Sequence, residues 1–315
     1  MLPKIIPVSP YGTLTGELFL YSGGRVAFES PSASTGISHL TTKKCILLGG
    51  LSDGLMPVPY TEKLEQCCTE NGFSLVQPIL SSSYTGFGHG SLDRDCEEIQ
   101  QLMDYLEVHR SPEGSECQFC LVGHSTGCQD IVHFLKRAPF KYRAKVHGFA
   151  LQAPVSDREH AEMEEGYAQN LALAQQMREN KKIDECMPRS AFWAPITARR
   201  FLDLQERGGT DDYFSSSYSD DELQQRIGHC VIDKAGDGTC QRHGLIAYSA
   251  AEEYVPEHVD CKLLSDRLAQ AMNFAVEEGP RARSICIPSA NHNLSKPTSG
   301  ASTFAIELSD LLKDM

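Results

Sequence analysis

The chain has 315 residues, of which 41% are hydrophobic and 23% charged, and this apolar content is enough for a sizeable core. Its formal net charge of -13 at pH 7 argues against nucleic acid or an anionic membrane as a partner, because like charges repel. No apolar run approaches the roughly 18 residues of a membrane span, and prolines interrupt residues 1–16 before a signal-peptide core forms, so we expect a cytoplasmic protein.

Six short apolar runs separated by helical stretches set the expected order of elements. We expect strands over residues 44–48, 73–80, 118–122, 146–151, 245–248 and 284–288. Apolar residues at helical spacing predict a helix over 91–106, and a second helix that begins just after Ser125 and includes 130–135. This alternation is typical of an α/β fold with a mainly parallel central sheet flanked by helices.

The alternation stops between residues 155 and 228. This segment has a long polar helical stretch over 159–182, and Ser219 precedes Glu222 by the spacing of a capping box, which predicts the start of another helix. We therefore expect a single domain over residues 1–315 with a helical cap inserted at 155–228.

A Gly-x-Ser-x-Gly motif lies where the third expected strand meets a helix. In Gly123-His124-Ser125-Thr126-Gly127, the glycines permit the tight strand-to-helix turn that exposes a nucleophilic serine. The helix start behind Ser125 also favours negative charge, which suits a tetrahedral oxyanion. The sequence predicts Ser125 as a nucleophile, and the alternative is an ordinary Gly/Ser turn.

A serine hydroxyl needs a base that is itself held by a carboxylate, in the chain order serine, acid, histidine for this type of motif. His292 follows the last expected strand and is the predicted base, with a surface-loop histidine as the alternative. The turn after residues 245–248 offers Glu252, which we favour as the acid, and its neighbour Glu253. Asp157 would serve if the acid lay one strand earlier.

Two loops are expected to contact the substrate. Thr126 and Leu51 would supply the backbone N–H groups of the oxyanion hole, with Gly50 as an alternative to Leu51. The Ser/Gly-rich loop after the second expected strand could place Tyr84 or His89 at the substrate, and its composition equally fits a loop exposed to solvent. We expect no metal and no cofactor, because the expected chemistry requires neither.

Long motifs along most of the chain resemble one family of α/β hydrolases, long labelled a domain of unknown function, with fungal, plant and protozoan members. The matching stretches are GGLSDG at 49–54, SSSYTGFG at 81–88, GHSTGCQD at 123–130, QAPVSDRE at 152–159, MPR at 187–189, FSS at 214–216, EYVP at 253–256 and NH at 291–292. The resemblance implies the α/β-hydrolase fold, with Ser125 and His292 in the triad. It implies Glu252 as the acid, although the family pattern Gly-Asp-Glu is Ala-Glu-Glu here.

The same family includes fungal esterases that open the ester bonds of fusarinine-type hydroxamate siderophores inside the cell. The resemblance therefore implies a serine esterase acting on a small-molecule ester, a ferri-siderophore that brings its own iron. Two alternatives stay open: another acyl substrate, such as a lipid ester, thioester or peptide, and a hydrolase-fold receptor that binds a ligand without turnover. The oligomeric state is not predicted.

Overall fold

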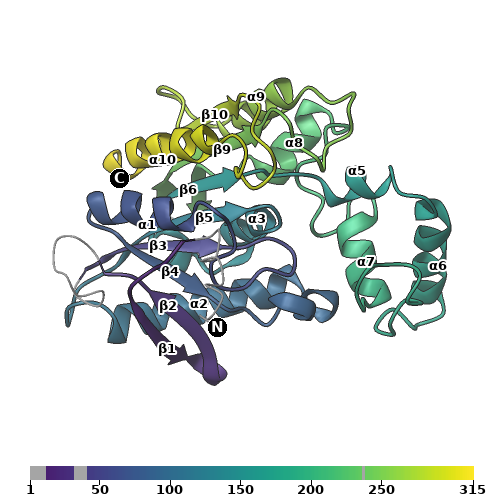
Figure 1. The fold of residues 1–315 in the computed structure, drawn as a ribbon, viewed down its shortest axis with the longest axis horizontal. Helices are drawn as coiled ribbons and strands as arrows, with labels where there is room; N and C mark the ends of the chain where they lie inside the picture. Colours follow the sequence, from purple (N-terminus) through teal and green to yellow (C-terminus); the bar gives the residue numbers. More distant parts are fainter. Residues whose placement is uncertain (1–11, 32–40, 236–237) are drawn as a thin grey trace, which may run out of the picture.

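An eight-stranded sheet forms the centre of the computed structural model, which describes residues 12–31, 41–235 and 238–315 (Figure 1). The strand order is β1-β2-β4-β3-β5-β6-β9-β10. The strands are β1 (Glu17–Tyr21), β2 (Arg25–Glu29), β3 (Lys43–Leu48), β4 (Ser74–Pro78), β5 (Gln118–His124), β6 (Val146–Gln152), β9 (His243–Ser249) and β10 (Ala282–Ile287). Residues 1–11, part of the segment in which we expect no signal peptide, lie outside the described residues.

The six strands from β4 to β10 pair in parallel and occupy the six apolar runs of the sequence. Strands β3 to β6 and β9 are almost fully buried, because helices cover both faces of the sheet. The antiparallel hairpin of β1 and β2 at one edge was not expected. Leu18 and Leu20 of β1 point to solvent, so this strand has no buried apolar run to reveal it.

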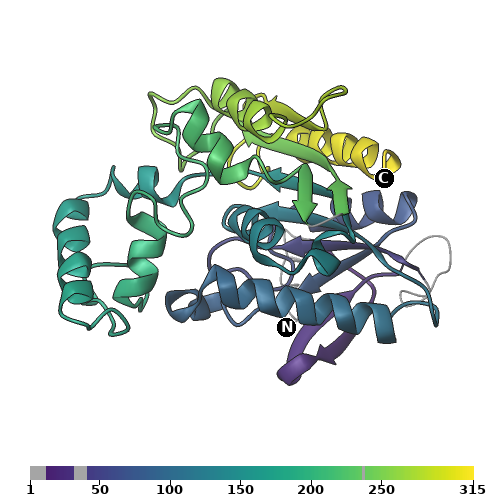
Figure 2. The same cartoon turned by 180° about the vertical axis from the view of Figure 1, so that it is seen from behind.

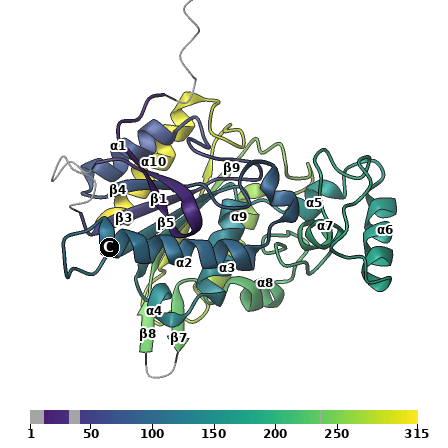
Figure 3. The ribbon, with the colours of Figure 1, turned by 90° about the horizontal axis from the view of Figure 1, so that it is seen from below.

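The covering helices form two layers (Figure 3). One face carries α1 (Thr61–Glu70) and α10 (Thr298–Lys313), and the other carries α2 (Leu92–His109), α3 (Gly127–Arg137) and α9 (Cys261–Met272). Helix α2 matches the stretch expected at 91–106, and Ser91 caps its N-terminus by accepting a hydrogen bond from the Arg94 amide. The α2 residues that were expected to form one apolar stripe are buried: Leu92, Cys96, Ile99, Leu102, Met103 and Leu106.

Three helices stand at one end of the molecule, away from the sheet: α5 (Asp157–Ala161), α6 (Tyr167–Glu179) and α7 (Ala198–Gln205) (Figure 1). Helices α6 and α7 contribute to an apolar cluster separate from the two sheet faces, with Ile196 and Phe201 among its buried residues. The single helical stretch expected at 159–182 is wrong. The chain breaks between α5 and α6, where Gly166 adopts a φ of 84° that an α-helix does not permit.

The chain after α7 returns to the body of the protein. Helix α8 (Asp220–Ile227) begins at the expected capping box of Ser219 and Glu222 and packs against α9. The boundaries of the cap, residues 155–228, stay a prediction. The remaining elements are the hairpin of β7 (Ile232–Ala235) and β8 (Gly238–Gln241), visible in Figure 2, the short helix α4 (Phe140–Arg143), and the 3₁₀ turns η1 (Ser22–Gly24) and η3 (Tyr84–His89).

Within the described parts of the chain, no helix combines the length and the apolar character that crossing a membrane requires.

Candidate active site

Ser125 occupies a sharp turn between β5, which ends at His124, and α3, which begins at Gly127. Its φ of 53° lies in the left-handed region, which is strained for a residue with a side chain. The flanking glycines are required by contact: a Cβ at Gly123 would lie 2.5 Å from the Gly127 carbonyl oxygen, and one at Gly127 2.3 Å from the Leu48 oxygen. The turn has the geometry of a nucleophile elbow.

His292 lies in the loop between β10 and α10, and its ring is held by Glu252. The distance from His292 Nδ1 to Glu252 Oε1 is 2.6 Å, and the Glu252 side chain is fully buried. This contact leaves Nε2 as the nitrogen that can accept a proton. Within the described residues no hydrogen bond joins Ser125 Oγ to the His292 ring, and such contacts commonly tighten in the complex with substrate.

The two other candidate acids have different partners. Glu253 Oε2 accepts a hydrogen bond from the backbone N–H of His292 at 2.6 Å, so it holds the loop and not the ring. Asp157 Oδ2 accepts from Gln129 Nε2 at 2.9 Å. Burial, with Asp211 nearby, raises the pKa of Asp157 to about 7, so this carboxyl group is not fully ionised at neutral pH. The structure brings Glu252 alone of the three to the imidazole ring.

The amides that could stabilise an oxyanion come from two loops. The Gly50 amide donates to Asp53 Oδ2 at 2.7 Å, so it is already engaged. The amides of Leu51 and Thr126 have no acceptor among the residues that the structure describes. Leu51 lies in the same cleft as Ser125, and Thr126 follows Ser125 in the elbow. This arrangement favours Leu51 over Gly50 as a donor.

The closeness of Gly50 to Ser125 supports a prediction. A Cβ at position 50 would lie 2.9 Å from Ser125 Cβ. The φ of Gly50 is outside the left-handed range, so an alanine here would be disfavoured by this steric contact and not by the backbone conformation. Gly50→Ala should therefore displace the nucleophile or the oxyanion loop and lower kcat by about 10- to 100-fold. Steady-state kinetics together with the melting temperature test it. An unchanged kcat would show that the contact does not constrain the site.

A cleft of about 680 Å³ lies between Ser125 and the α5–α7 helices. Ligand sites of this size are common in enzymes for small molecules. The Tyr254 ring packs edge-on against the His292 ring at 4.5 Å, and Trp193, 57% exposed, also lines the cleft. Sequence patterns did not predict either as a substrate contact, because their positions depend on packing between segments that are distant in the sequence. Neither Tyr84 nor His89 lines this cleft, and a substrate contact by either stays a prediction.

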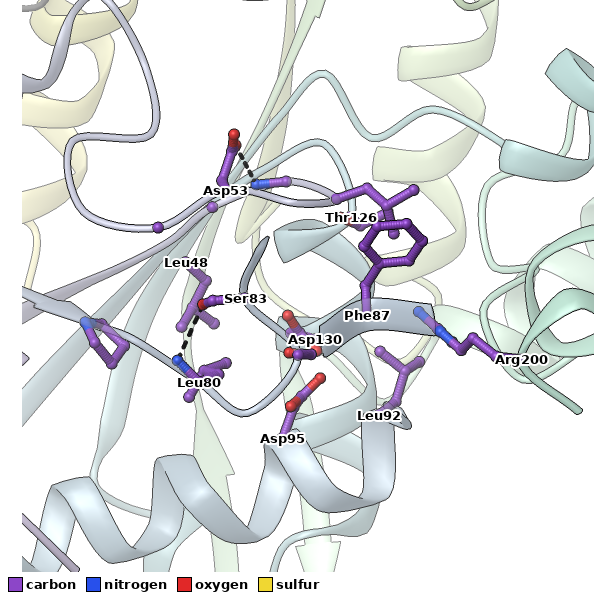
Figure 4. A pocket seen from close by; sticks show the side chains of 16 residues that line it. Leu48, Asp53, Leu80, Ser83, Phe87, Leu92, Asp95, Thr126, Asp130 and Arg200 are labelled. Atoms are coloured by element: carbon purple, nitrogen blue, oxygen red, sulfur yellow. Dashed lines mark hydrogen bonds between the residues drawn. The ribbon is translucent and has the colours of Figure 1, made fainter. Parts of the chain in front are cut away.

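A second, much smaller cavity of about 40 Å³ lies behind the oxyanion loop (Figure 4). The carboxyl groups of Asp95 and Asp130 lie close together in it, and Oδ1 of each is buried without a hydrogen-bond partner among the described residues. Burial raises the pKa of Asp95 to about 6, and burial together with Asp95 raises that of Asp130 well above its ordinary value. The cavity is lined by Thr126 as well, and a raised pKa favours the uncharged form of an acid beside this residue, which would lessen repulsion of an oxyanion.

Replacing Asp130 with asparagine should stabilise the protein at neutral pH. The raised pKa means that native Asp130 contributes stability below the pKa of the unfolded state, about 4, and loses it as pH rises through the folded-state pKa. An asparagine amide does not ionise, so the substitution removes that loss. Asp130→Asn should thus melt about 2–4 °C higher than the native protein at pH 8 and at about the same temperature near pH 4. A lower melting temperature of Asp130→Asn at pH 8 would contradict a raised pKa of Asp130.

Comparisons with known proteins give the chain clear relatives. It matches the family described as "Protein of unknown function (DUF1749)" over residues 7–309. It is 32% identical over 295 residues to a UPF0613 protein of Schizosaccharomyces pombe, covering 90% of this chain and 92% of that protein. It is 30% identical over 331 residues to a fusarinine C esterase of Aspergillus fumigatus, covering 91% of each.

A solved structure shares the whole architecture. The siderophore hydrolase EstB from Aspergillus fumigatus aligns with a TM-score of 0.77 at 27% identity, over 97% of this chain and 98% of that one. An α/β-hydrolase-fold protein is also among the similar structures, and these matches confirm the fold class expected from the sequence.

Proposed function

The chain belongs to the DUF1749 family, and on this premise we propose that it is a carboxylic ester hydrolase with Ser125, His292 and Glu252 as its triad. The single observation that carries the proposal is the 2.6 Å contact between His292 Nδ1 and the buried Glu252 carboxylate, in the cleft that contains Ser125. Two relatives are named as a siderophore hydrolase and a fusarinine C esterase, which supports hydrolysis of esters.

The proposed reaction passes through an acyl-enzyme. His292 Nε2 takes the proton of Ser125 as its Oγ attacks the ester carbonyl carbon, and the amides of Leu51 and Thr126 hold the resulting oxyanion. Glu252 stabilises the imidazolium that forms. His292 then gives the proton to the leaving alcohol. A water activated by His292 cleaves the acyl-enzyme, releases the acid and returns Ser125 to its starting form.

The proposed substrate is a hydroxamate siderophore of the fusarinine type, whose iron is released after its ester bonds are cut. The names of the two relatives support this choice, and the cleft has room for a ligand of drug-like size. Two aromatic side chains that line the cleft, Trp193 and Tyr254, would provide surfaces for the hydrocarbon parts of such a molecule. The cytoplasmic location stays a prediction.

A direct comparison of substrates tests this proposal. The ferric complex of a fusarinine-type siderophore and the 4-nitrophenyl esters of acetate and butyrate should be offered to the same preparation. We expect kcat/KM for the siderophore ester to exceed that for the short esters by about 100-fold or more, because binding outside the reacting bond adds to transition-state binding. Turnover of the short esters alone would refute the siderophore assignment. Failure to hydrolyse any ester would refute the proposed esterase activity.

A further inference from the structure

A buried glutamine joins three elements around the candidate site. Gln152, the last residue of β6, is fully buried. Its Oε1 accepts a hydrogen bond from the Tyr60 hydroxyl at 2.9 Å and lies 2.6 Å from His124 Nδ1. Its Nε2 donates to the His292 carbonyl oxygen at 2.9 Å, and its own backbone oxygen accepts from the Ser125 amide at 3.0 Å. One residue thereby connects the nucleophile turn with the loop of the base.

These contacts permit one orientation of the Gln152 amide. In the reversed orientation Oε1 would face the His292 carbonyl oxygen, and two acceptors would meet without a proton between them. Burial raises the pKa of Tyr60 well above its ordinary value, so its hydroxyl remains a donor to Oε1. The atom of Gln152 that faces His124 is therefore an acceptor, and His124 Nδ1 must carry the proton.

The second nitrogen of the His124 ring is then an acceptor. Burial, together with the nearby His292, lowers the pKa of His124 to about 3, so its ring is neutral at physiological pH. A neutral imidazole with a proton on Nδ1 carries a lone pair on Nε2. His124 lines the cleft beside Ser125, and its Nε2 has no hydrogen-bond partner within the described chain.

We propose that Gln152 is a positioning residue that fixes His124 as the neutral Nδ1–H tautomer, so that His124 presents Nε2 to the substrate as a hydrogen-bond acceptor. The proposal rests on the esterase function proposed above. In this role His124 selects esters that carry an N–H or O–H donor close to the scissile carbonyl. Its neutral ring, 4.8 Å from that of His292, also adds no positive charge when His292 takes the serine proton.

Few titratable groups face the His124 ring. His292, from the loop after β10, is in direct ring contact, and Glu252 acts through His292. Tyr60, just before α1, reaches His124 through Gln152, and the Cys128 thiol of α3 donates to the Gln152 backbone oxygen. Because burial raises the pKa of both Tyr60 and Cys128, both are neutral, and His292 is the group whose charge His124 senses.

Two isosteric substrates test the acceptor nitrogen. The 4-nitrophenyl esters of N-acetylglycine and of levulinic acid differ by one N–H in place of one CH₂. The native protein should prefer the N-acetylglycine ester by about 3- to 10-fold in kcat/KM, the range expected of one hydrogen bond. His124→Phe should bring this ratio to about one, whatever its effect on the absolute rates. Equal rates for the two esters in the native protein would overturn the acceptor role.

A charge change at Gln152 tests the positioning role. In Gln152→Glu a carboxylate would face His124 Nδ1 and stabilise the imidazolium, so the pKa of His124 should rise. We expect the pKa of His124, followed by its side-chain ¹⁵N shifts, to rise by about 1–3 units, and kcat/KM to fall on the acid side of the profile, with activity recovering at higher pH. Tyr60→Phe is the matched control: it removes one hydrogen bond to the same Oε1 and should leave the profile in place. A fall in kcat/KM of Gln152→Glu by the same factor at every pH would mean that Gln152 has only a structural role.

The tautomer itself can be observed without any assay of activity. In side-chain ¹⁵N spectra of the native protein, with His124→Phe as the assignment control, His124 should carry its proton on Nδ1 and should not titrate above about pH 4. A proton on Nε2, or titration near pH 6.5, would overturn the proposal. Labelling of Ser125 by a fluorophosphonate tests the proposed function separately, so the two failures are distinguishable.

Discussion

Ser125→Ala is expected to lower kcat for ester hydrolysis by about 10⁴- to 10⁶-fold while KM and the melting temperature stay close to those of the native protein. The substitution removes the Oγ that forms the acyl-enzyme. The expected residual rate would come from the proposed oxyanion donors, the amides of Leu51 and Thr126, and from substrate binding, which the substitution leaves in place. Steady-state kinetics on the best ester found in the substrate comparison measures the effect.

Ser289→Ala is the matched control for this experiment. Ser289 lies two residues after the end of β10, and its φ of 58° is left-handed like that of Ser125. Both variants therefore place alanine in the same strained backbone conformation, but Ser289 does not line the cleft. We expect kcat of Ser289→Ala within about threefold of the native value. A Ser125→Ala protein that kept more than a few per cent of native kcat would exclude Ser125 as the nucleophile.

The neighbouring residues Glu252 and Glu253 form a second test with a large expected effect. Glu252→Gln replaces the carboxylate that touches His292 Nδ1 with a neutral amide, so the imidazolium loses its partner and the ring can adopt the wrong tautomer. We expect kcat to fall by about 10³- to 10⁴-fold. Glu253→Gln keeps an oxygen that accepts the backbone N–H of His292, and should cost about tenfold or less.

The ratio between these two variants is the informative quantity, since each removes one negative charge from the same turn. Comparable losses would mean that both carboxylates act on His292 mainly through its loop. A larger loss in Glu253→Gln would transfer the acid role to Glu253 and contradict the observed ring contact. Melting temperatures of both proteins show whether either change acts through folding.

Local patterns were sufficient to predict the parallel strands and the turn at Ser125. Six apolar runs mark strands buried on both faces, and the glycines around Ser125 leave little choice of backbone at that point. His292 could be predicted as the base because it lies in a polar loop that follows the last of these strands. Each of these inferences depends on residues that are close together in the sequence.

Contacts between distant segments could not be predicted in this way. Glu252 and Glu253 are the same residue type at consecutive positions, so local sequence hardly distinguishes them. Which one contacts the His292 ring depends on how the turn after β9 packs against the loop after β10. The role of Gln152 depends on Tyr60, 92 residues away, and on His292, 140 residues away. The interruption between α5 and α6 shows a further limit, because the polar composition of this stretch does not reveal that one helix ends at Ala161 and the next begins after Gly166.

The most direct test of the central claim is the covalent capture of the nucleophile. The native protein should be treated with a fluorophosphonate and the modified peptide identified by mass spectrometry. We expect one adduct per chain, on Ser125, with labelling slowed by a hydrolysable ester and absent from Ser125→Ala. An adduct on another residue, or labelling of Ser125→Ala as fast as that of the native protein, would contradict a mechanism that begins at Ser125.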